Sequence, residues 1–439
     1  MAAKLRAVTL SSRLRAAIPV DVLRDGGGVF AALISANILT YSFYALVSRE
    51  IGVAASGIFT ALLSAMLIAS LPSAVVAVVF AKVSADRCAI GDLGEIRALG
   101  LGASWLAVVV GVGAFLAAEL MPGVFAEFFH VTDSRTIMLA VVGYAFTFAI
   151  PMQRSVLQGA GAFRPFTISN IVEALVKCAT GVCVFAFRLG IIEALAGYAA
   201  AEAVTFLFNG AVIVRRFPGG GIRWVSTLVD LGKSSLGIIV PIGAITSMTF
   251  LDVILVQHYL PGREAGLYGV AALFGRALLT AIAFAPAVLL PKAVERISAG
   301  QSAVPLLVST LAATAAVAFA VLGLTIIMPR IIIEALAGPK FLGATPLMLP
   351  YATAMTGLAG ATVLSTYLIA LGRRAFAIPL AIVAACEAIT IAFFRHGDLG
   401  QVLAVVVIGH TAGFAVCLAS VVASVRAGVP RPGLRYHRP

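Results

Sequence analysis

The chain has 439 residues, of which 61% are hydrophobic and only 11% are charged, with a net charge of +12 and a mean hydropathy of +1.07. Charged residues make up about a quarter of a soluble globular chain, so this composition excludes a soluble protein and indicates an integral membrane protein. Because lipid offers no hydrogen-bond partner to an open strand edge, the long apolar runs are predicted to be helices. The predicted fold class is therefore all-α and polytopic.

Apolar runs between charge clusters and Gly or Pro breaks predict about twelve transmembrane helices. The first six would form an N-lobe (28–214) and the last six a C-lobe (234–425), joined by a cytoplasmic linker at 215–233. Residues 1–27 and 426–439 would be cytoplasmic segments, and the first run lacks the short core and cleavage site of a signal peptide. In chain order, the predicted spans are 28–48, 57–81, 98–120, 136–152, 166–187, 194–214, 234–259, 265–290, 305–328, 346–371, 375–394 and 400–425.

The positions of the basic residues predict the orientation in the membrane, because Lys and Arg in short loops are retained on the cytoplasmic side. With the N-terminus inside, 22 of the 31 Lys and Arg residues fall in cytoplasmic segments, 7 fall outside, and Lys177 and Arg276 lie within spans. Both termini are therefore predicted to be cytoplasmic, and the positive charge is explained without a nucleic-acid partner. The five cysteines form no CxxC motif, so no disulfide, metal site or cofactor is predicted.

The second half of the chain repeats features of the first half. The joint SREIGVAASGIF (48–59) returns as QHYLPGREAGLYG (257–269), and Gly57 and Gly266 in these joints are 209 residues apart. The segments MPGVFAE and MPRIIIE are 207 residues apart, and LQGAGAF and LIALGRR are 211 apart. A repeat of six spans predicts two lobes related by an axis along the membrane normal, with a site between them near the midplane. This arrangement favours a transporter, although duplication alone would also produce a larger bundle.

Proline residues lie within several of the predicted spans, and four of them stand out. Pro72 in the second span and Pro286 in the eighth are 214 residues apart, close to the repeat period, and Pro241 and Pro379 lie in two others. Proline removes a backbone hydrogen bond and often kinks a helix. We interpret these prolines either as hinges or as packing irregularities.

Three segments together resemble the recurring joints of bacterial polysaccharide flippases, which belong to the multidrug/oligosaccharidyl-lipid/polysaccharide exporter superfamily. These segments are SREIGVAASGIF, LDVILVQHYLPGREAGLYGVAALFGRALL (251–279) and PRIIIEALAGPKFLGATPLMLP (329–350). The resemblance implies two lobes of six helices around a V-shaped cavity lined by spans 1, 2, 7 and 8. The chain differs from the superfamily's peptidoglycan lipid flippases, which usually have two further helices and more cavity arginines.

The resemblance also implies a function and a location. The implied function is the flipping of an undecaprenyl-diphosphate-linked oligosaccharide from the cytoplasmic to the periplasmic leaflet for lipopolysaccharide O-antigen, capsule or exopolysaccharide. The implied location is the bacterial inner membrane. The implied partners are the lipid-linked oligosaccharide, the lipid bilayer, and a polysaccharide polymerase with its chain-length machinery.

Arg276 is the first candidate for substrate binding. An ionisable residue at the bilayer centre costs roughly 2.5–3.5 kcal/mol on insertion scales, and Arg276 lies near the middle of the eighth span with no acidic residue three or four positions away. A guanidinium fork fits two phosphate oxygens, so a diphosphate-linked lipid would suit it. The alternative is an ion pair with Asp252 on the preceding span.

The remaining polar residues within the spans allow two interpretations each. Lys177 is either neutralised by Glu173 at i,i+4 or faces the cavity as a second phosphate contact. Asp252 and Glu202 are either proton or sodium sites or structural ion-pair partners. Arg49, at the outer mouth, is either a substrate contact or an interfacial anchor.

Asparagines and the last two spans supply the other candidates. Asn37 is a candidate cavity residue, although Asn37, Asn170 and Asn209 are all expected to hydrogen-bond between helices. Glu387 and His410 are interpreted as structural.

Two other classes of protein are alternatives. A membrane enzyme of polysaccharide assembly would need a catalytic loop, but the longest outer loop has about 17 residues and the chain lacks DxD, HExxH and GxSxG motifs, so the chain is not predicted to be an enzyme. A drug or cation exporter of the same superfamily would share the fold but would need no cationic cavity. Residues 329–350 are predicted to form an amphipathic or partly re-entrant cap over the outer mouth, with Gly338 and Lys340 accessible. The alternative is that this segment packs in the core.

Overall fold

The computed structural model describes residues 20–219, 224–282 and 284–426, and within these ranges every regular element is helical. The predicted all-α fold class is confirmed, and each of the twelve predicted spans falls on a helix or on a pair of consecutive helices. Among the described residues, nine helices have the length and hydropathy to cross a membrane, or ten if the bent pair α3 and α4 is counted as one span. The helices are α2 Val20–Ile51, α3 Val53–Ala69, α4 Leu71–Ala89, α5 Leu93–Leu120, α6 Pro122–Phe129, α7 Ser134–Gly159, α8 Phe163–Phe187, α9 Ile191–Arg216, α10 Trp224–Tyr259, α11 Arg263–Ala281, α12 Phe284–Ser298, α13 Val304–Ile327, α14 Pro329–Leu336, η1 Pro339–Ala344, α15 Thr345–Ala370, α16 Ala377–Phe393 and α17 Leu399–Arg426.

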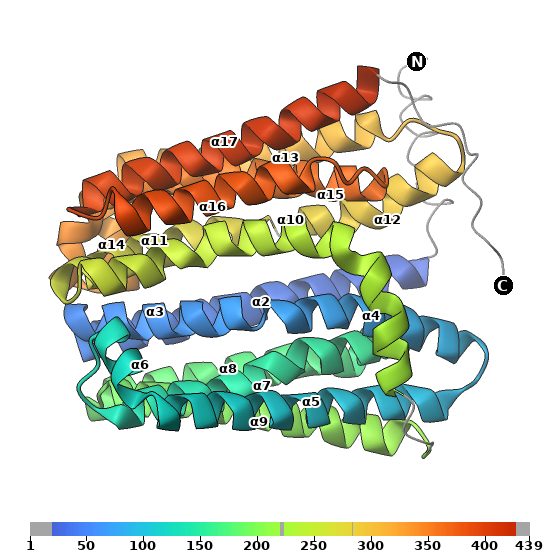
Figure 1. Ribbon diagram of the computed structural model, residues 1–439, viewed down its shortest axis with the longest axis horizontal. Helices are drawn as coiled ribbons and strands as arrows, with labels where there is room; N and C mark the ends of the chain where they lie inside the picture. Colours follow the sequence, from blue (N-terminus) through green and yellow to red (C-terminus); the bar gives the residue numbers. More distant parts are fainter. Residues whose placement is uncertain (1–19, 220–223, 283, 427–439) are drawn as a thin grey trace, which may run out of the picture.

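The helices form two lobes, α2 to α9 and α10 to α17, which lie side by side in Figure 1. In the first lobe α2 packs on α8, while α7 contacts α4, α5 and α9; in the second lobe α10 packs on α16, while α15 contacts α12, α13 and α17. The short helices α6 and α14 have eight residues each and begin 207 positions apart. The predicted two lobes related by internal duplication are therefore confirmed.

Part of the segment predicted as a linker between the lobes is helical. Helix α9 ends at Arg216 and α10 begins at Trp224, so helical residues extend into the segment predicted as a linker, and residues 220–223 lie outside the described ranges. The predicted terminal segments fall mainly on residues 1–19 and 427–439, which also lie outside them.

The repeated joint has the same backbone conformation in both lobes. Gly52, which precedes α3, has φ of 82°, and Gly262, which precedes α11, has φ of 80°. A side chain disfavours this left-handed region, whereas glycine enters it freely. Two further joints repeat the pattern, with positive φ at Gly91 and Gly300 and at Gly161 and Gly372.

A second repeated feature is the break near a proline. Helix α3 ends at Ala69, and α4 continues at a 45° bend with Pro72 in its first turn. In the other lobe α11 ends at Ala281, and α12 begins at Phe284, two residues before Pro286. The prolines therefore do interrupt both spans at equivalent places, and their action as hinges stays a prediction.

The two ends of the bundle differ. Helices α6 and α14 lie at one end, here called the cap end, and α2 begins and α17 ends at the other, the terminal end (Figure 1). Near the cap end α3 packs against α10 and α11 of the opposite lobe. A β-carbon on Gly57 would lie 2.8 Å from the backbone nitrogen of Gly266, and one on Gly266 would lie 1.8 Å from the Val53 carbonyl oxygen. The lobes are therefore in direct backbone contact near the cap end.

Candidate functional site

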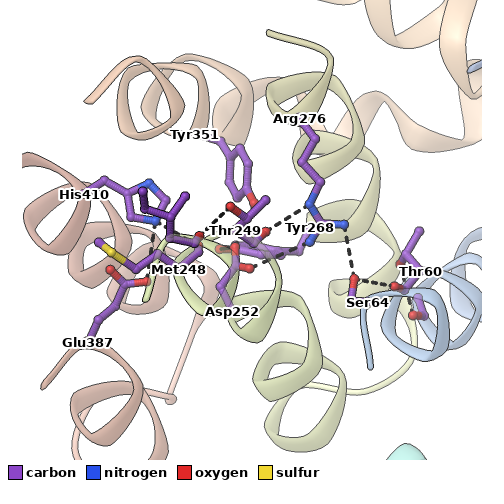
Figure 2. A network of polar contacts seen from close by, with 12 residues as sticks. Thr60, Ser64, Met248, Thr249, Asp252, Tyr268, Arg276, Tyr351, Glu387 and His410 are labelled. Carbon is purple, nitrogen blue, oxygen red and sulfur yellow. Dashed lines mark hydrogen bonds and ion pairs between the residues drawn. The ribbon is translucent and has the colours of Figure 1, made fainter. Parts of the chain in front are cut away.

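Arg276 lies on α11 at the boundary between the lobes and is held from both sides. Its Nε donates to the Thr249 carbonyl on α10 at 3.1 Å, and its Nη1 donates to the Ser64 hydroxyl on α3 of the opposite lobe, also at 3.1 Å. The guanidinium carbon is 4.5 Å from the centre of the Phe250 ring. Figure 2 shows this arginine reaching between the two sets of helices, so its position is coupled to the relative position of the lobes.

Asp252 is the nearest carboxylate to Arg276, but its main partners are tyrosines. Its Oδ2 accepts hydrogen bonds of 2.8 Å from both Tyr268 and Tyr351 (Figure 2). Its Oδ1 lies 3.9 Å from Arg276 Nη2, which is too long for a hydrogen bond. Both of these atoms are buried without a hydrogen-bond partner among the described residues. The predicted ion pair is therefore formed only loosely.

Lys177 is enclosed in a balanced cluster within the N-lobe. Its Nζ lies 2.5 Å from Glu173 on the same helix and 2.7 Å from Glu202 on α9, and it sits 4.3 Å from the centre of the Tyr198 ring. Arg154 on α7 adds a second cation, with Nη2 2.7 Å from Glu173. Two cations and two carboxylates thus neutralise one another, and the predicted pair of Glu173 and Lys177 is formed.

Arg154 is a member of this charged cluster that the sequence did not reveal. The predicted span 136–152 ends before Arg154, which left this arginine in a cytoplasmic loop. Helix α7 continues to Gly159, so Arg154 lies within the helix, and its Nε donates to the Ser169 hydroxyl. Hydropathy gave no sign of this arginine, because Gln153 and Arg154 end the apolar run before the helix ends. Tyr268, Tyr351 and Ser64 were missed because neutral residues in an apolar span carry no charge signal.

Glu387 and His410 form a second pair, between α16 and α17. His410 Nε2 lies 3.6 Å from Glu387 and 3.0 Å from the Met248 carbonyl oxygen on α10. Glu387 follows Lys177 by 210 residues, and His410 follows Glu202 by 208. The pair therefore occupies the same place in the C-lobe as Lys177 and Glu202 in the N-lobe, with the acidic and basic positions exchanged.

Arg49 lies at the cap end, at the last turn of α2. Its Nη2 donates to the carbonyl oxygens of Glu334 and Ala335 on α14, at 2.9 and 2.6 Å. The structure therefore gives Arg49 a protein partner in the opposite lobe and does not bring it together with Arg276 or Lys177.

The asparagines do not follow the prediction of bonds between helices. Asn170 donates to the Phe166 carbonyl of its own helix, because the i−4 carbonyl is the nearest acceptor, so the prediction is wrong for this residue. Asn209 is buried with neither amide atom hydrogen-bonded to a described residue. Asn37 is exposed on α2 and makes no hydrogen bond to the described residues.

The predicted cap is formed by α14 and η1, which pack on α11 and on the end of α2. Ile333 and Phe341 are buried while Ile331 is exposed, so the segment is amphipathic. Lys340 is exposed as predicted, but Gly338 is buried. The prediction of an accessible Gly338 is wrong in this conformation because the Arg49 side chain covers it, with Cγ 3.5 Å from the place of a β-carbon.

The described residues contain no group of three or more His, Cys, Asp or Glu side chains placed to hold a metal ion. The arrangement instead offers a largely buried cation at the boundary between the lobes, with a carboxylate oxygen of the C-lobe beside it. The described residues thus form a two-lobed bundle of helices, many of them long and apolar enough to cross a membrane. One loosely formed ion pair lies near the boundary between the lobes, and others lie within each lobe. This is the architecture of a polytopic membrane protein built by duplication.

Comparison with known proteins extends this description. No protein-family model matches the chain, and no curated protein matches its sequence. An inward-facing multidrug resistance MATE family transporter of the MOP superfamily matches with a TM-score of 0.68 at 14% identity, covering 90% of this chain and 94% of that one. The lipid II flippase MurJ in an inward closed conformation matches with a TM-score of 0.64 at 16% identity, covering 90% and 87%. An outward-facing MATE family transporter matches with a TM-score of 0.52 at 12% identity, covering 90% and 93%.

The chain therefore has the fold of the MOP-superfamily transporters. The resemblance seen in the sequence is confirmed at the level of the fold. The similar structures are described as transporters and a flippase.

Proposed function

We propose that the chain is a transporter that flips an undecaprenyl-diphosphate-linked oligosaccharide from the cytoplasmic to the periplasmic leaflet by alternating access between its lobes. The product would serve lipopolysaccharide O-antigen, capsule or exopolysaccharide synthesis. The similarity to the lipid II flippase MurJ supports the proposal, because MurJ has the same fold and its name describes it as a flippase of a lipid.

The observation that carries the proposal is the state of Arg276. Its side chain is 15% exposed, it lies between the lobes, and its Nη2 has no hydrogen-bond partner among the described residues. Asp252 is 3.9 Å away and already accepts two tyrosine hydroxyls. The guanidinium therefore keeps one nitrogen without a partner, which a diphosphate oxygen would satisfy, and a fork to two oxygens would form if Nη1 released Ser64.

The other candidate residues receive narrower roles. Lys177 has both carboxylates of its cluster within 2.7 Å, so a second phosphate contact would require this cluster to open. Asp252 keeps one oxygen without a partner, and we propose it as the proton or sodium site that couples the cycle. Glu202 is bound to Lys177 and is proposed as a structural partner. Asn37, exposed on α2, is proposed as a contact for the neutral sugars.

The orientation and boundaries complete the proposal. The cation distribution favours a cytoplasmic terminal end and a periplasmic cap end, in a bacterial inner membrane. The lobes would comprise 28–214 and 234–425, and a polymerase with its chain-length machinery would take the flipped product.

A cation exporter is the alternative, because one of the similar structures is a multidrug resistance transporter. A fixed cation near the midplane lowers the cost of moving negative charge through a low dielectric and repels a cationic drug. The charge at Arg276 therefore separates the two functions.

Four variants test the proposal: Arg276→Ala, Arg276→Lys, Asp252→Ala and the double Arg276→Ala/Asp252→Ala. Export of the surface glycan and the amount of folded protein in the membrane are measured for each. We expect Arg276→Ala to abolish export at a normal protein level, and Arg276→Lys to recover it partly, because lysine keeps the charge but loses the fork. Full export by Arg276→Ala, or rescue by the double variant, would remove Arg276 from the substrate site.

A further inference from the structure

The two lobes are joined at the cap end by hydrogen bonds from side chains to backbone carbonyls. The first set involves Arg49 at the end of α2, whose guanidinium donates to two carbonyls in the last turn of α14. Helix α2 belongs to the N-lobe and α14 to the C-lobe. These bonds therefore exist only while the lobes are together at this end.

The second set runs in the opposite direction, from the C-lobe to the N-lobe. Gln257 at the end of α10 donates through Nε2 to the Phe129 carbonyl of α6 at 2.9 Å. His258 Nδ1 lies 3.1 Å from the Phe128 carbonyl oxygen, and its ring stacks on the Phe128 ring at 4.4 Å between centroids. Because a carbonyl only accepts, Nδ1 carries the proton in this contact.

The two sets are equivalent under the internal duplication. Gln257 follows Arg49 by 208 residues, and α14 follows α6 by 207. In each set, the last turn of a lobe's first helix reaches the last turn of the other lobe's short helix. The last carbonyls of a helix lack an intrahelical partner, and the negative end of the helix dipole favours a cation such as Arg49. The short helices thus present acceptors to the opposite lobe.

We propose that these two sets are paired latches, which hold the cap end closed and must both release before that end opens. The latches flank the crossing of α3 and α11, where Gly57 and Gly266 bring the backbones into contact. Separation of the lobes at this crossing would break both sets at once. With the cap end placed on the periplasmic side as proposed above, the higher TM-score to an inward-facing than to an outward-facing transporter structure, 0.68 against 0.52, supports a closed cap end. The proposal holds for any substrate and does not rest on the role of Arg276.

A buried residue at the crossing reports the opening. Ser56 on α3 is fully buried there, so a cysteine at this position reacts with a water-soluble maleimide only when the lobes separate at the cap end. The labelling rate of Ser56→Cys is measured in purified protein, and the same protein with Ser56 retained gives the contribution of the native cysteines.

The latch variants are Arg49→Ala, Gln257→Ala and the double variant, each combined with Ser56→Cys. We expect Gln257→Ala, which loses one hydrogen bond, to raise the labelling rate about fivefold, and Arg49→Ala, which loses two, to raise it about 25-fold. The double change should raise it about 125-fold, the product of the two single effects, because distant and independent effects add in free energy and therefore multiply in rate. The matched control is Arg330→Ala, which removes an exposed arginine of α14 that has no hydrogen bond or ion pair to the described residues.

Three results would overturn the proposal. Labelling of the double variant at the parent rate would mean that these bonds do not hold the cap end. A double variant equal to one single variant would mean that only one set acts as a latch. An equal rise in Arg330→Ala would show a general loosening of the protein. If Arg49→Ala does not yield folded protein, Arg49→Lys replaces it, with an intermediate rise expected because lysine lacks the fork.

Discussion

The contact between Gly57 and Gly266 yields the sharpest prediction about how the lobes move. In Gly266→Ala, the new β-carbon would lie 1.8 Å from the Val53 carbonyl oxygen and 2.6 Å from its carbonyl carbon. Both atoms belong to the backbone of the opposite lobe, so no side-chain rotation relieves the clash. Real β-carbon contacts stay above 3.0 Å, and α3 and α11 must therefore move apart by at least 1.2 Å at this point.

The size of the effect follows from the cost of overpacking. Inserting a methyl group into a well-packed interface costs about 1–3 kcal/mol, which corresponds to a factor of about 5 to 150 in an equilibrium constant. The cost applies only while the cap end is closed. Gly266→Ala should therefore shift the equilibrium toward the open cap end by this factor.

The assay is the labelling rate of Ser56→Cys in purified protein, together with the melting temperature. Gly57→Ala should show a smaller rise than Gly266→Ala, because its β-carbon would meet its nearest atom at 2.8 Å. Gly113→Ala on α5 and Gly323→Ala on α13 are the controls, since no atom lies within 4 Å of either new β-carbon. If Gly266→Ala labels and melts like Gly113→Ala, the lobes are not held in contact at this crossing, and the reasoning is refuted.

Three further predictions concern the charged pairs and the orientation. Lys177→Ala should lower the free energy of unfolding by about 3–5 kcal/mol, because it leaves buried carboxylates without their cation. The double variant with Glu202→Gln should recover part of this lost stability in thermal unfolding. A double variant no more stable than Lys177→Ala would contradict the ion-pair role. Gly409→Ala should lower the melting temperature, since its β-carbon would lie 2.0 Å from a carboxylate oxygen of Glu387; an unchanged melting temperature would show that the carboxylate is free to move away. A reporter fused in the loop between α12 and α13 should appear in the cytoplasm and one fused between α14 and α15 outside; the reverse result would invert the orientation predicted from the basic residues.

The sequence predicted the fold well because the relevant signals are local. Hydropathy located each span, since every helix in lipid must satisfy its own backbone. The duplication was visible because joints such as Gly52 and Gly262 need a left-handed backbone, which few residues other than glycine adopt. Helix ends were less well predicted, and the early end assigned to α7 left Arg154 in a loop.

The candidate site was only partly predictable, because its contacts join residues that are far apart in the chain. The pair of Glu173 and Lys177 was expected from i,i+4 spacing, whereas Glu202 reaches Lys177 from another helix. The tyrosines on Asp252 come from α11 and α15, 16 and 99 residues away. No periodicity in the sequence encodes such a distance, so hydropathy identified charges in the membrane without identifying most of their partners.

The exchanged polarity of the two intralobe pairs has a consequence for assembly of the chain. Glu202 and His410 are each the twelfth residue of their helix, and Lys177 and Glu387 face them from the preceding helix. A duplicated chain carries similar helices twice, so mispairing between its halves is a hazard during folding. If α16 packed beside α9, the acidic side chains of Glu387 and Glu202 would lie together. If α8 packed beside α17, the basic side chains of Lys177 and His410 would lie together. Each pair thus matches its own lobe and not the other, and we expect this mismatch to disfavour wrong pairing of the two halves during folding.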